Sequence, residues 1–490
     1  MLSGKHGGAA PSGLPRRASG TAGSGLGVLK KPDKKAYEFI AKQYEHLQTF
    51  QQYHEGIFAA LGAEDGEVYD LITKEYQRLQ NTLQLIAAEN QCSRAVLAAL
   101  GSVVQNKTTD GFPGARLHGG SEIVDDMERL AVTRAKQAFG CQYANVQPHS
   151  GTQANQIVIT ALLEKKDKVL SMALDQGGHF SHGAKVSFTG RFFDTENYCV
   201  DRTSFLLDYD AIRRQALASR PKLIICGASA YARTIDFEKF RHIADEVGAY
   251  LLADISHIAG QVIAGVHPSP VNYAHFTTTS TYKPGGPRGG LILMGRDCNQ
   301  KIKWAGRDMP LWEVIQRATF PGMQGTPYLN HIAAKAVFFR ETLSPEYRTR
   351  QFKIVENAKQ LAANLLNLGC DVLTKGTDNH MVLINVANFK KGLTGVIAQK
   401  CLESCGIVIN MSRLPYDRKD PMITGGIRLG TPIVTKNGMG TNEMEIIAAF
   451  IDGTLKEVKP TGDSEYKISE SFKEQTKNRV KDLCGRFPLH

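Results

Sequence analysis

The 490-residue chain lacks long apolar runs and paired cysteines. No apolar stretch approaches the roughly 20 residues that a membrane span requires, so we expect no membrane partner. The nine cysteines form no CxxC motif, and the closest two, Cys401 and Cys405, stand at helical spacing. This pattern predicts no metal site and is typical of reduced thiols in a cytoplasmic enzyme. The sequence also lacks an apolar signal region, which argues against secretion.

Acidic residues are scarce near the N-terminus, where much of the net charge of +11 lies. Residues 1–35 contain seven basic residues and one acidic residue, which gives +6, and the remaining chain is only mildly basic. This distribution predicts a basic tail on a folded body and no nucleic-acid partner. Because residues 1–28 are rich in Gly, Ala and Ser, we expect residues 1–35 to be disordered. The role of residues 1–35 is open between a transit peptide, a flexible tail and an added expression segment.

The hydrophobic pattern after this tail predicts an α/β protein. Residues 36–87 have helical periodicity and predict an N-terminal helical arm or dimer contact. In residues 88–330, near-continuous apolar strands alternate with amphipathic helices, which indicates a large domain with a mostly parallel sheet covered on both faces. Residues 331–460 predict a smaller α+β domain, which begins with a long helical stretch over 330–366. Residues 461–490 are expected to form a C-terminal tail. In parallel sheets of this kind, functional sites lie beyond the carboxyl ends of the strands.

The segment TTTSTYKPGGPRGG (277–290) places a single lysine, Lys283, before a Pro/Gly-rich turn. Upstream, the apolar strand LLADIS ends in Asp254, and His257 follows closely. A pyridoxal phosphate enzyme needs a lysine that forms a Schiff base and an aspartate that keeps the pyridine nitrogen protonated. The sequence therefore predicts a pyridoxal 5'-phosphate site, although Lys283 taken alone is equally typical of a surface turn.

Three further motifs predict groups that hold a phosphate, a ring and a carboxylate. Ser150, Gly151 and Thr152 follow a strand and open a helix, where backbone N–H groups and hydroxyls suit a phosphate; an ordinary helix cap is the competing interpretation. His179, among the glycines of GGHFSHG, is a candidate to stack on a pyridine ring or to move protons. Arg428, on the small-residue strand GGIRLGT, is a candidate carboxylate clamp. The competing interpretations are a structural histidine and a structural salt bridge.

From about residue 84 to 455 the chain resembles the serine (glycine) hydroxymethyltransferase family, a group of one-carbon transferases. The resemblance rests on segments that occur in the same order, among them LIAAENQCSRAVLAALGSVVQNK, DGFPGARLHGG, VQPHSGTQAN, GGHFSHG, ASAYAR, DISHIAG, FPGMQG, GTDNHMVL and GGIRLGTP. It implies a fold-type I pyridoxal phosphate-dependent transferase, similar to aspartate aminotransferase. It also implies an amino-acid substrate, tetrahydrofolate as co-substrate, and an obligate homodimer, or a tetramer, with sites at the subunit interface.

The resemblance also implies a role for each matching residue. Lys283 corresponds to the Schiff-base lysine, Asp254 to the partner of the pyridine nitrogen, and His179 to the ring-stacking histidine. The remaining matches are Ser150, Gly151 and Gly325 as phosphate contacts, with Gly325 reaching across from the other subunit; Ser229 and His257 around the phenolic oxygen; and Arg428 as the carboxylate clamp. For the proton transfer that accompanies Cα–Cβ cleavage, Asp110 and His118 are the candidates, with His257 and His179 as second choices.

The chain departs from the family pattern near the lysine. Tyr282 falls where the family has a histidine, and one residue is missing in the following turn. We place this gap after Lys283, because a Pro-Gly-Gly turn absorbs a deletion more easily than a strand end does. The alternative alignment puts Tyr282 on the lysine position.

A second departure concerns the substrate and folate contacts. Thr108 replaces a tyrosine, Asp110 a glutamate, and Leu117 and His118 a tyrosine pair, while Ser412 replaces an asparagine that contacts folate. Together Thr108, Asp110 and His118 resemble the α-methylserine branch of the family, and threonine in place of tyrosine leaves room beside Cα for a methyl group. The resemblance therefore implies an α-methylserine hydroxymethyltransferase or aldolase as an alternative to a serine/glycine enzyme. The same departures also fit a folate-independent transaldolase, or a non-catalytic family member with a structural or regulatory role.

Overall fold

The computed structural model describes His54 and residues 56–489. The predicted disordered tail and residues 36–53 of the predicted arm therefore lie outside the described residues. The chain divides into a short unit that ends at Tyr69 and a large unit that begins at Asp70. Helix α3 (Ile57–Glu64) belongs to the first unit and buries none of its residues, and α4 (Gly66–Asn81) begins there. No helix in the described ranges has the length and apolar character needed to cross a membrane.

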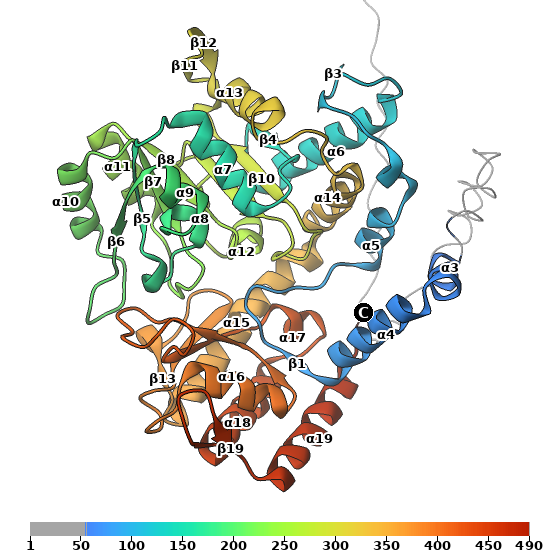
Figure 1. Cartoon of the computed structure of the whole chain (residues 1–490), viewed down its shortest axis with the longest axis vertical. Coiled ribbons are helices and arrows are strands. Elements are labelled where there is room, and N and C mark those ends of the chain that lie inside the picture. Colours follow the sequence, from blue (N-terminus) through green and yellow to red (C-terminus); the bar gives the residue numbers. More distant parts are fainter. Residues whose placement is uncertain (1–53, 55, 490) are drawn as a thin grey trace, which may run out of the picture. The chain divides into compact units, whose positions relative to one another are not determined.

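A seven-stranded sheet forms the centre of the large domain (Figure 1). Only β10 runs antiparallel to its neighbours, so the predicted mostly parallel sheet is confirmed. In spatial order, the strands are β4 (Tyr143–Asn145), β10 (Gly290–Met294), β9 (Phe276–Ser280), β8 (Tyr250–Asp254), β7 (Leu223–Gly227), β5 (Lys168–Met172) and β6 (Asp194–Tyr198).

Both faces of this sheet are buried, because side chains of each strand alternate between two separate cores. On β7, Ile224 belongs to one core and Ile225 to the other, and both are fully buried. The Ile225 face packs against α7 (Gly151–Leu162) and α13 (Leu311–Arg317). The helices that cover the Ile224 face include α6 (Glu122–Phe139), α11 (Phe237–Val247), α12 (Ala259–Ala264) and α14 (Leu329–Thr342).

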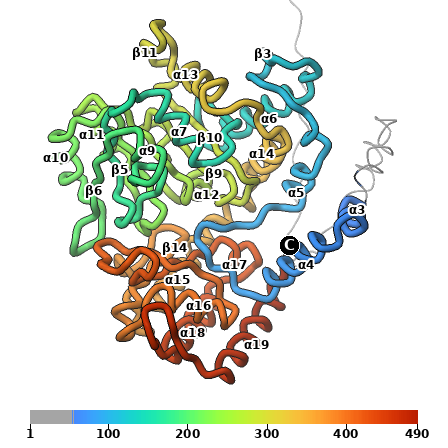
Figure 2. The backbone as a smooth tube through the Cα atoms, viewed as in Figure 1, coloured from blue at the N-terminus to red at the C-terminus, as the bar shows by residue number. Residues whose placement is uncertain are grey.

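The chain passes from the large to the small domain through α15 (Pro345–Asn367), which contacts both α12 and α18 (Thr441–Glu457) (Figure 2). The sequence predicts one helical stretch over residues 330–366, but Ser344 caps a new helix and Pro345 occupies its first turn. Proline is favoured there because its missing N–H has no partner in a first turn. The break separates α14 from α15.

The small domain is built on a four-stranded antiparallel sheet. Its order is β13 (Asp371–Val372), β14 (Met381–Asn385), β17 (Gly426–Gly430) and β16 (Asn410–Ser412). Helix α16 (Gly395–Ser404) and α18 cover it. Two flanking segments join the same core: Leu83 on β1 (Leu83–Gln84), which pairs with β15 (Ile407–Val408), and Val480 on α19 (Glu470–Arg486). The segment expected as a C-terminal tail thus contributes a packed helix.

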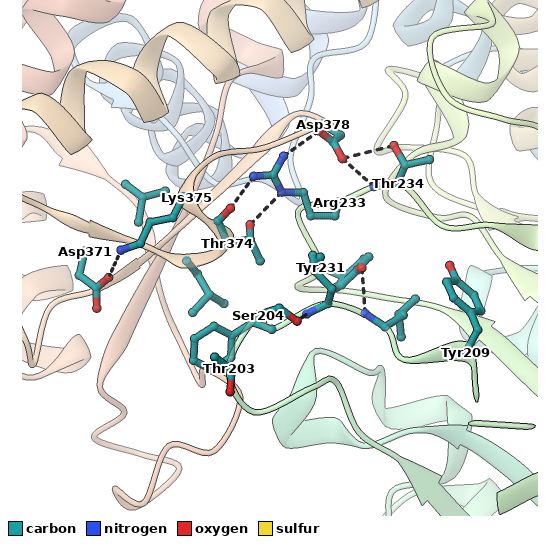
Figure 3. A pocket seen from close by; sticks show the side chains of 15 residues that line it. Thr203, Ser204, Tyr209, Tyr231, Arg233, Thr234, Asp371, Thr374, Lys375 and Asp378 are labelled. Atoms are coloured by element: carbon teal, nitrogen blue, oxygen red, sulfur yellow. Dashed lines mark hydrogen bonds and ion pairs between the residues drawn. The ribbon is translucent and has the colours of Figure 1, made fainter. Parts of the chain in front are cut away.

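Arg233 joins the two domains beside a cavity of about 580 Å³ (Figure 3). Its guanidinium pairs with Asp378 at 2.9 Å and donates to the hydroxyl of Thr374 at 3.1 Å. The same Asp378 carboxylate accepts the backbone N–H of Thr234 at 3.1 Å. None of the predicted site residues lines this cavity. Because its charged groups are already paired, we assign the cavity's lining to domain attachment.

A buried arginine fixes the hairpin that carries the predicted residue Asp110. Arg116 lies on β3 (Ala115–Arg116), which pairs with β2 (Gly111–Phe112). Its side chain, only 3% exposed, pairs with Asp125 at 2.8 Å and with Glu128 at 2.5 Å. Both acids lie on α6. Burial of these charges is tolerated because each has a partner, so the hairpin depends on the arginine.

Arg116→Ala is expected to destabilise the protein by about 3–5 kcal/mol, since two buried carboxylates would lose their cation. The measurement is the urea unfolding midpoint, followed by circular dichroism at fixed protein concentration. Arg129→Ala is the matched control: Arg129 also pairs with Asp125, but its side chain is 53% exposed, and its loss should cost about 1 kcal/mol or less. Equal effects of the two substitutions would contradict this account of the hairpin.

Candidate active site

The carboxyl ends of the parallel strands deliver polar side chains to one cavity of about 190 Å³. Such an edge is the expected place for a site in a parallel sheet. Predicted site residues that line this cavity are Ser150, Gly151 and Thr152 at the start of α7, His179 after β5, Ser229 after β7, Asp254 and His257 at the end of β8, and Lys283 after β9. Residues that are distant in the sequence therefore meet here.

A second, larger cavity of about 800 Å³ adjoins the first. The two share His179, Ser229, His257, Tyr282 and Lys283 in their linings. The larger one also reaches the small domain, where Arg428 and Ser412 line it. The 190 Å³ cavity is thus an inner chamber and the 800 Å³ cavity an outer chamber, and the two meet at Lys283.

The buried Asp254 carboxylate is surrounded by hydrogen-bond donors. Asn155 Nδ2 donates at 2.8 Å and His182 Nε2 lies at 2.9 Å from one oxygen, while the Ser256 hydroxyl donates to the other at 2.6 Å. Burial raises the pKa of Asp254, but the hydrogen bond and charge of His182, with help from His179 and Ser256, outweigh it and hold this pKa below its usual range. Asp254 is therefore a fixed negative charge on the inner chamber wall.

His179 presents a neutral ring to both chambers. It is the N-cap of α8 (Phe180–Gly183), where its Nδ1 accepts the backbone N–H of Ser181 at 3.2 Å. Burial, and then the neighbouring His182 and Lys283, lower the pKa of His179 to about 4. A neutral imidazole suits stacking on a flat cationic ring, because it adds no charge repulsion.

The turn before α7 forms a cradle for an anion. Ser150 caps the helix by accepting the N–H of Gln153 at 3.1 Å. At Gly151, an added Cβ would lie 3.1 Å from the backbone N of Ser280 and 3.3 Å from Ser256 Oγ, so a side chain would crowd the chamber wall. Arg288 lines the same chamber. Helix N–H groups, hydroxyls and a guanidinium form a donor set that fits a phosphate.

Lys283 points its amine into the chambers with little to neutralise it. Nζ donates to Ser280 Oγ at 3.1 Å and lies 4.7 Å from the centre of the Tyr282 ring. Arg288 lies over the same ring at 4.5 Å. No carboxylate forms an ion pair with Lys283 among the described residues. The backbone carbonyl of Lys283 accepts from Asn90 Nδ2 at 3.0 Å, which fixes the turn and leaves the side chain to the cavity.

Arg428 is a partly buried cation held by neutral groups. Its guanidinium donates to Asn410 Oδ1 at 3.3 Å and to the backbone carbonyl of Ser229. The described residues offer it no acid partner, so the structural salt bridge weighed for this arginine is not realised. Burial lowers the pKa of Arg428 to about 10, and the guanidinium stays charged. A carboxylate ligand would supply the missing charge.

His257 contacts a second buried histidine, His380. Their rings are nearly parallel, with centres 5.6 Å apart, and His257 Nδ1 lies 3.5 Å from His380 Nε2. Burial, followed by the charge of Arg428, lowers the pKa of His380 to about 3. Burial also lowers the pKa of His257, with Lys283 and Arg428 adding to the effect. Both rings are therefore neutral near pH 7.

Four predicted residues do not reach Lys283 within one chain. Thr108, Asp110, His118 and Gly325 line neither chamber. Three of them gather at a separate place: the backbone N–H of Asp110 donates to His118 Nδ1 at 3.2 Å, and an added Cβ on Gly325 would lie 3.8 Å from Asp110 Oδ1. Asp110 also accepts from the hydroxyl of Thr326 at 2.8 Å. Within one chain the predicted residues thus form two groups, because Arg116 ties the hairpin to α6.

The site contains residues that sequence reasoning missed. These are Asn155, His182 and Ser256, which hold Asp254, and Ser280, which holds the amine of Lys283. His182 had a detectable signal, because it is the second histidine of GGHFSHG. Asn155 had none, since it lies 99 residues from its partner Asp254.

A mostly parallel α/β sheet, a smaller C-terminal domain, and a lysine facing a buried aspartate define the class of fold-type I pyridoxal phosphate proteins. The family model for serine hydroxymethyltransferase matches residues 61–451, well over half of the chain. The chain belongs to the serine hydroxymethyltransferase family. This family is pyridoxal phosphate-dependent, generally uses tetrahydrofolate and acts on amino acids, so a hydroxymethyltransferase type of activity follows for this chain.

His380 is expected to make stability depend on pH. Its pKa is about 3 in the folded protein, below the ~6.5 of an unfolded chain. Between these values the unfolded chain binds one proton more, so stability is present above about pH 6.5 and is lost as the pH falls. His380→Gln should reduce the slope of unfolding free energy against pH by up to about 1.4 kcal/mol per unit between about pH 6 and about pH 4.5.

Urea unfolding at a series of pH values measures this slope. His242→Gln, on the exposed surface of α11, controls for the loss of a histidine as such. If His380→Gln and the wild-type protein gave the same slope, His380 would not be buried in its neutral form.

Proposed function

We propose that the protein is a pyridoxal phosphate-dependent serine/glycine hydroxymethyltransferase. It cleaves the Cα–Cβ bond of a β-hydroxy amino acid reversibly and transfers the one-carbon unit to tetrahydrofolate. One observation carries the proposal: the Lys283 amine, the buried Asp254 carboxylate and the unpaired Arg428 guanidinium face two adjoining chambers. This combination matches what an amino-acid-handling enzyme of this class needs, a point of attachment, a ring partner and a carboxylate clamp.

The inner chamber would hold the cofactor. Ser150, Gly151 and Thr152 would bind its phosphate, Asp254 would keep its ring nitrogen protonated, and His179 would lie against the ring. When bound, pyridoxal phosphate supplies a ring that accepts the electron pair of the broken Cα bond. Lys283 is the attachment residue. The alignment that puts Tyr282 in this role is less well supported, because only Lys283 carries an amine near Asp254 and His179.

The outer chamber would hold the amino acid. Arg428 would bind its carboxylate bidentately, since no acid of the described chain competes for the guanidinium. Ser229 would help to orient the ligand, because its backbone already holds Arg428 and its side chain lines both chambers. The neutral rings of His179 and His257 leave the substrate ammonium free of like-charge repulsion.

The second group of residues would act in the site of a partner subunit of a homodimer. Asp110 would transfer the proton of the substrate hydroxyl, His118 would support it, and Gly325 would contact the cofactor phosphate. Exposed apolar side chains flank this group, as expected of a surface that a partner covers. They are Leu97 (56% exposed), Val103 (41%), Leu117 (72%) and Ile123 (68%).

Thr108 and Ser412 support an α-methylserine-type enzyme as the second candidate. Thr108 is exposed beside Asp110, and its short side chain would leave space at Cα for a methyl group. Ser412 lines the outer chamber, where the family has an asparagine that contacts folate. A folate-independent transaldolase and a non-catalytic relative are further interpretations of the same departures. Cofactor trapping and substrate turnover distinguish these three interpretations from one another and from the serine/glycine enzyme.

The first test traps the cofactor. Borohydride reduction of the holoenzyme should attach the pyridoxyl group to the peptide that contains Lys283, as read by mass spectrometry. Lys283→Ala should lose the label and the turnover of L-serine with tetrahydrofolate, whereas Lys375→Ala, an exposed lysine elsewhere, should keep both. A label on another residue contradicts the assignment, and no bound cofactor at all would favour a non-catalytic relative. Turnover of α-methylserine instead of serine would select the second candidate. Turnover that does not require tetrahydrofolate would select a transaldolase.

The second test asks whether the site is shared between subunits. Asp110→Asn alone should slow turnover by about 10²–10⁴-fold, as expected for loss of a general base. Mixed dimers of Lys283→Ala and Asp110→Asn subunits should regain activity, because one of their two sites then combines an intact Lys283 with an intact Asp110. Dimers formed by each variant alone are the controls. Failure of mixed dimers to exceed both controls would place Asp110 and Lys283 in the same subunit's site.

A further inference from the structure

Two buried side chains and a partly buried one form a chain that ends at the cavity wall. Gln261, on α12, lies with its Nε2 3.0 Å from His380 Nδ1. His380 Nε2 lies 3.1 Å from the backbone carbonyl oxygen of Ala87 and 3.5 Å from His257 Nδ1. Gln261 and His380 are each 2% exposed and line neither chamber. His257 lines both chambers.

The contacts fix where His380 carries its proton. The carbonyl oxygen of Ala87 can only accept, so His380 Nε2 must be the N–H donor. His380 is neutral, since burial lowers its pKa to about 3, and its Nδ1 is therefore a bare acceptor. That acceptor takes a hydrogen bond from the amide of Gln261, which determines which way this amide is turned.

The same reasoning extends to His257. The His380 Nε2–H faces both the Ala87 carbonyl and His257 Nδ1, so His257 Nδ1 has to be bare to avoid two opposed N–H groups. Burial keeps His257 neutral by lowering its pKa, and a neutral imidazole has one proton. That proton therefore lies on Nε2. This nitrogen makes no hydrogen bond to any group of residues 56–489, and it is left for a ligand.

We propose that His380, whose proton the Ala87 carbonyl holds on Nε2, is a positioning residue that keeps His257 as an Nε2–H donor toward the chambers. The ligand group opposite His257 is then an acceptor, and an anionic ring oxygen is the group that this donor favours. Without His380, His257 would exchange its proton between both nitrogens and would present a bare lone pair to that oxygen part of the time. The identity of the ligand as the cofactor's ring oxygen rests on the proposed function. The tautomer itself does not.

The direct test reads the tautomer of His257 by nitrogen NMR of protein labelled with ¹⁵N-histidine, with and without pyridoxal phosphate. The wild-type protein should show the proton on Nε2. His380→Leu, which removes the N–H opposite His257 Nδ1, should shift His257 toward a mixture of tautomers. Gln261→Leu should leave the His257 tautomer unchanged, because the Ala87 carbonyl still holds the His380 proton on Nε2. Gln351→Leu, at a buried glutamine packed on α12 at Gly260, controls for the loss of a buried polar side chain. An unchanged His257 tautomer in His380→Leu would overturn the proposal.

A second pair of variants separates donation from packing. In His380→Gln the amide Nε2 can still donate toward Ala87 and His257, whereas His380→Leu has no donor. His380→Leu should weaken pyridoxal phosphate binding about threefold to tenfold, as expected for one hydrogen bond, and should change the pH profile of the bound cofactor's visible absorbance. His380→Gln should restore both toward the wild-type values. Equal behaviour of the two variants would assign His380 to packing alone and would contradict the proposal.

The two proposals fail in different ways. Loss of the borohydride label at Lys283 would refute the proposed function but would leave the tautomer of His257 in the cofactor-free protein as it is. Conversely, a labelled Lys283 together with a His257 proton on Nδ1 would refute only the positioning role of His380.

Discussion

The buried charge of Asp254 is the constraint on which the rest of the site depends. A carboxylate taken out of water has to be hydrogen-bonded, and here its donors come from separate elements: Asn155 from α7, His182 from α8, and Ser256 after β8. Each donor is held in turn, since Asn155 accepts from Thr278 at 2.6 Å and the Ser256 hydroxyl accepts from the backbone N–H of Ser280. The network therefore places the helix start, the histidine turn and the strand before Lys283 relative to one charge.

The small domain completes the site by adding a charge of the opposite sign. Arg428 lies partly buried among neutral acceptors, and such a guanidinium is less stable without an anion than with one. The carboxylate of the proposed substrate would relieve this deficit, so part of the binding free energy would come from an arrangement that folding has already set up. The attachment of Asp378 and Thr374 to Arg233 keeps the two domains in register for this purpose, and His380 follows directly on the same segment.

Local sequence patterns are sufficient to predict much of the fold and the inner chamber. The continuous apolar runs of β7 and β8 predict buried parallel strands. The polar residues just after these strands predict that the site lies at one edge of the sheet. Strand β9, FTTTS, carries threonines instead of aliphatic residues. Its sequence therefore does not predict a buried strand and indicates only that this segment leads to Lys283. Two of its buried threonines have hydroxyl partners, Thr278 in Asn155 and Thr279 in the backbone carbonyl of Ser280. Such long-range pairs leave no local signal, and neither does the contact between Gln261 and His380.

The grouping of Asp110 with Gly325 is equally invisible in the sequence, because it depends on how Arg116 ties a hairpin to α6. Its consequence is physical. The charges at Asp254 and Arg428 are fixed when one chain folds, whereas a proton-transfer group supplied by a second chain is present only after assembly. An isolated subunit would then bind cofactor and a carboxylate yet lack the base that starts Cα–Cβ cleavage. Under the proposed function, this separation would tie catalysis to assembly and would protect the bound cofactor from reacting before the site is complete.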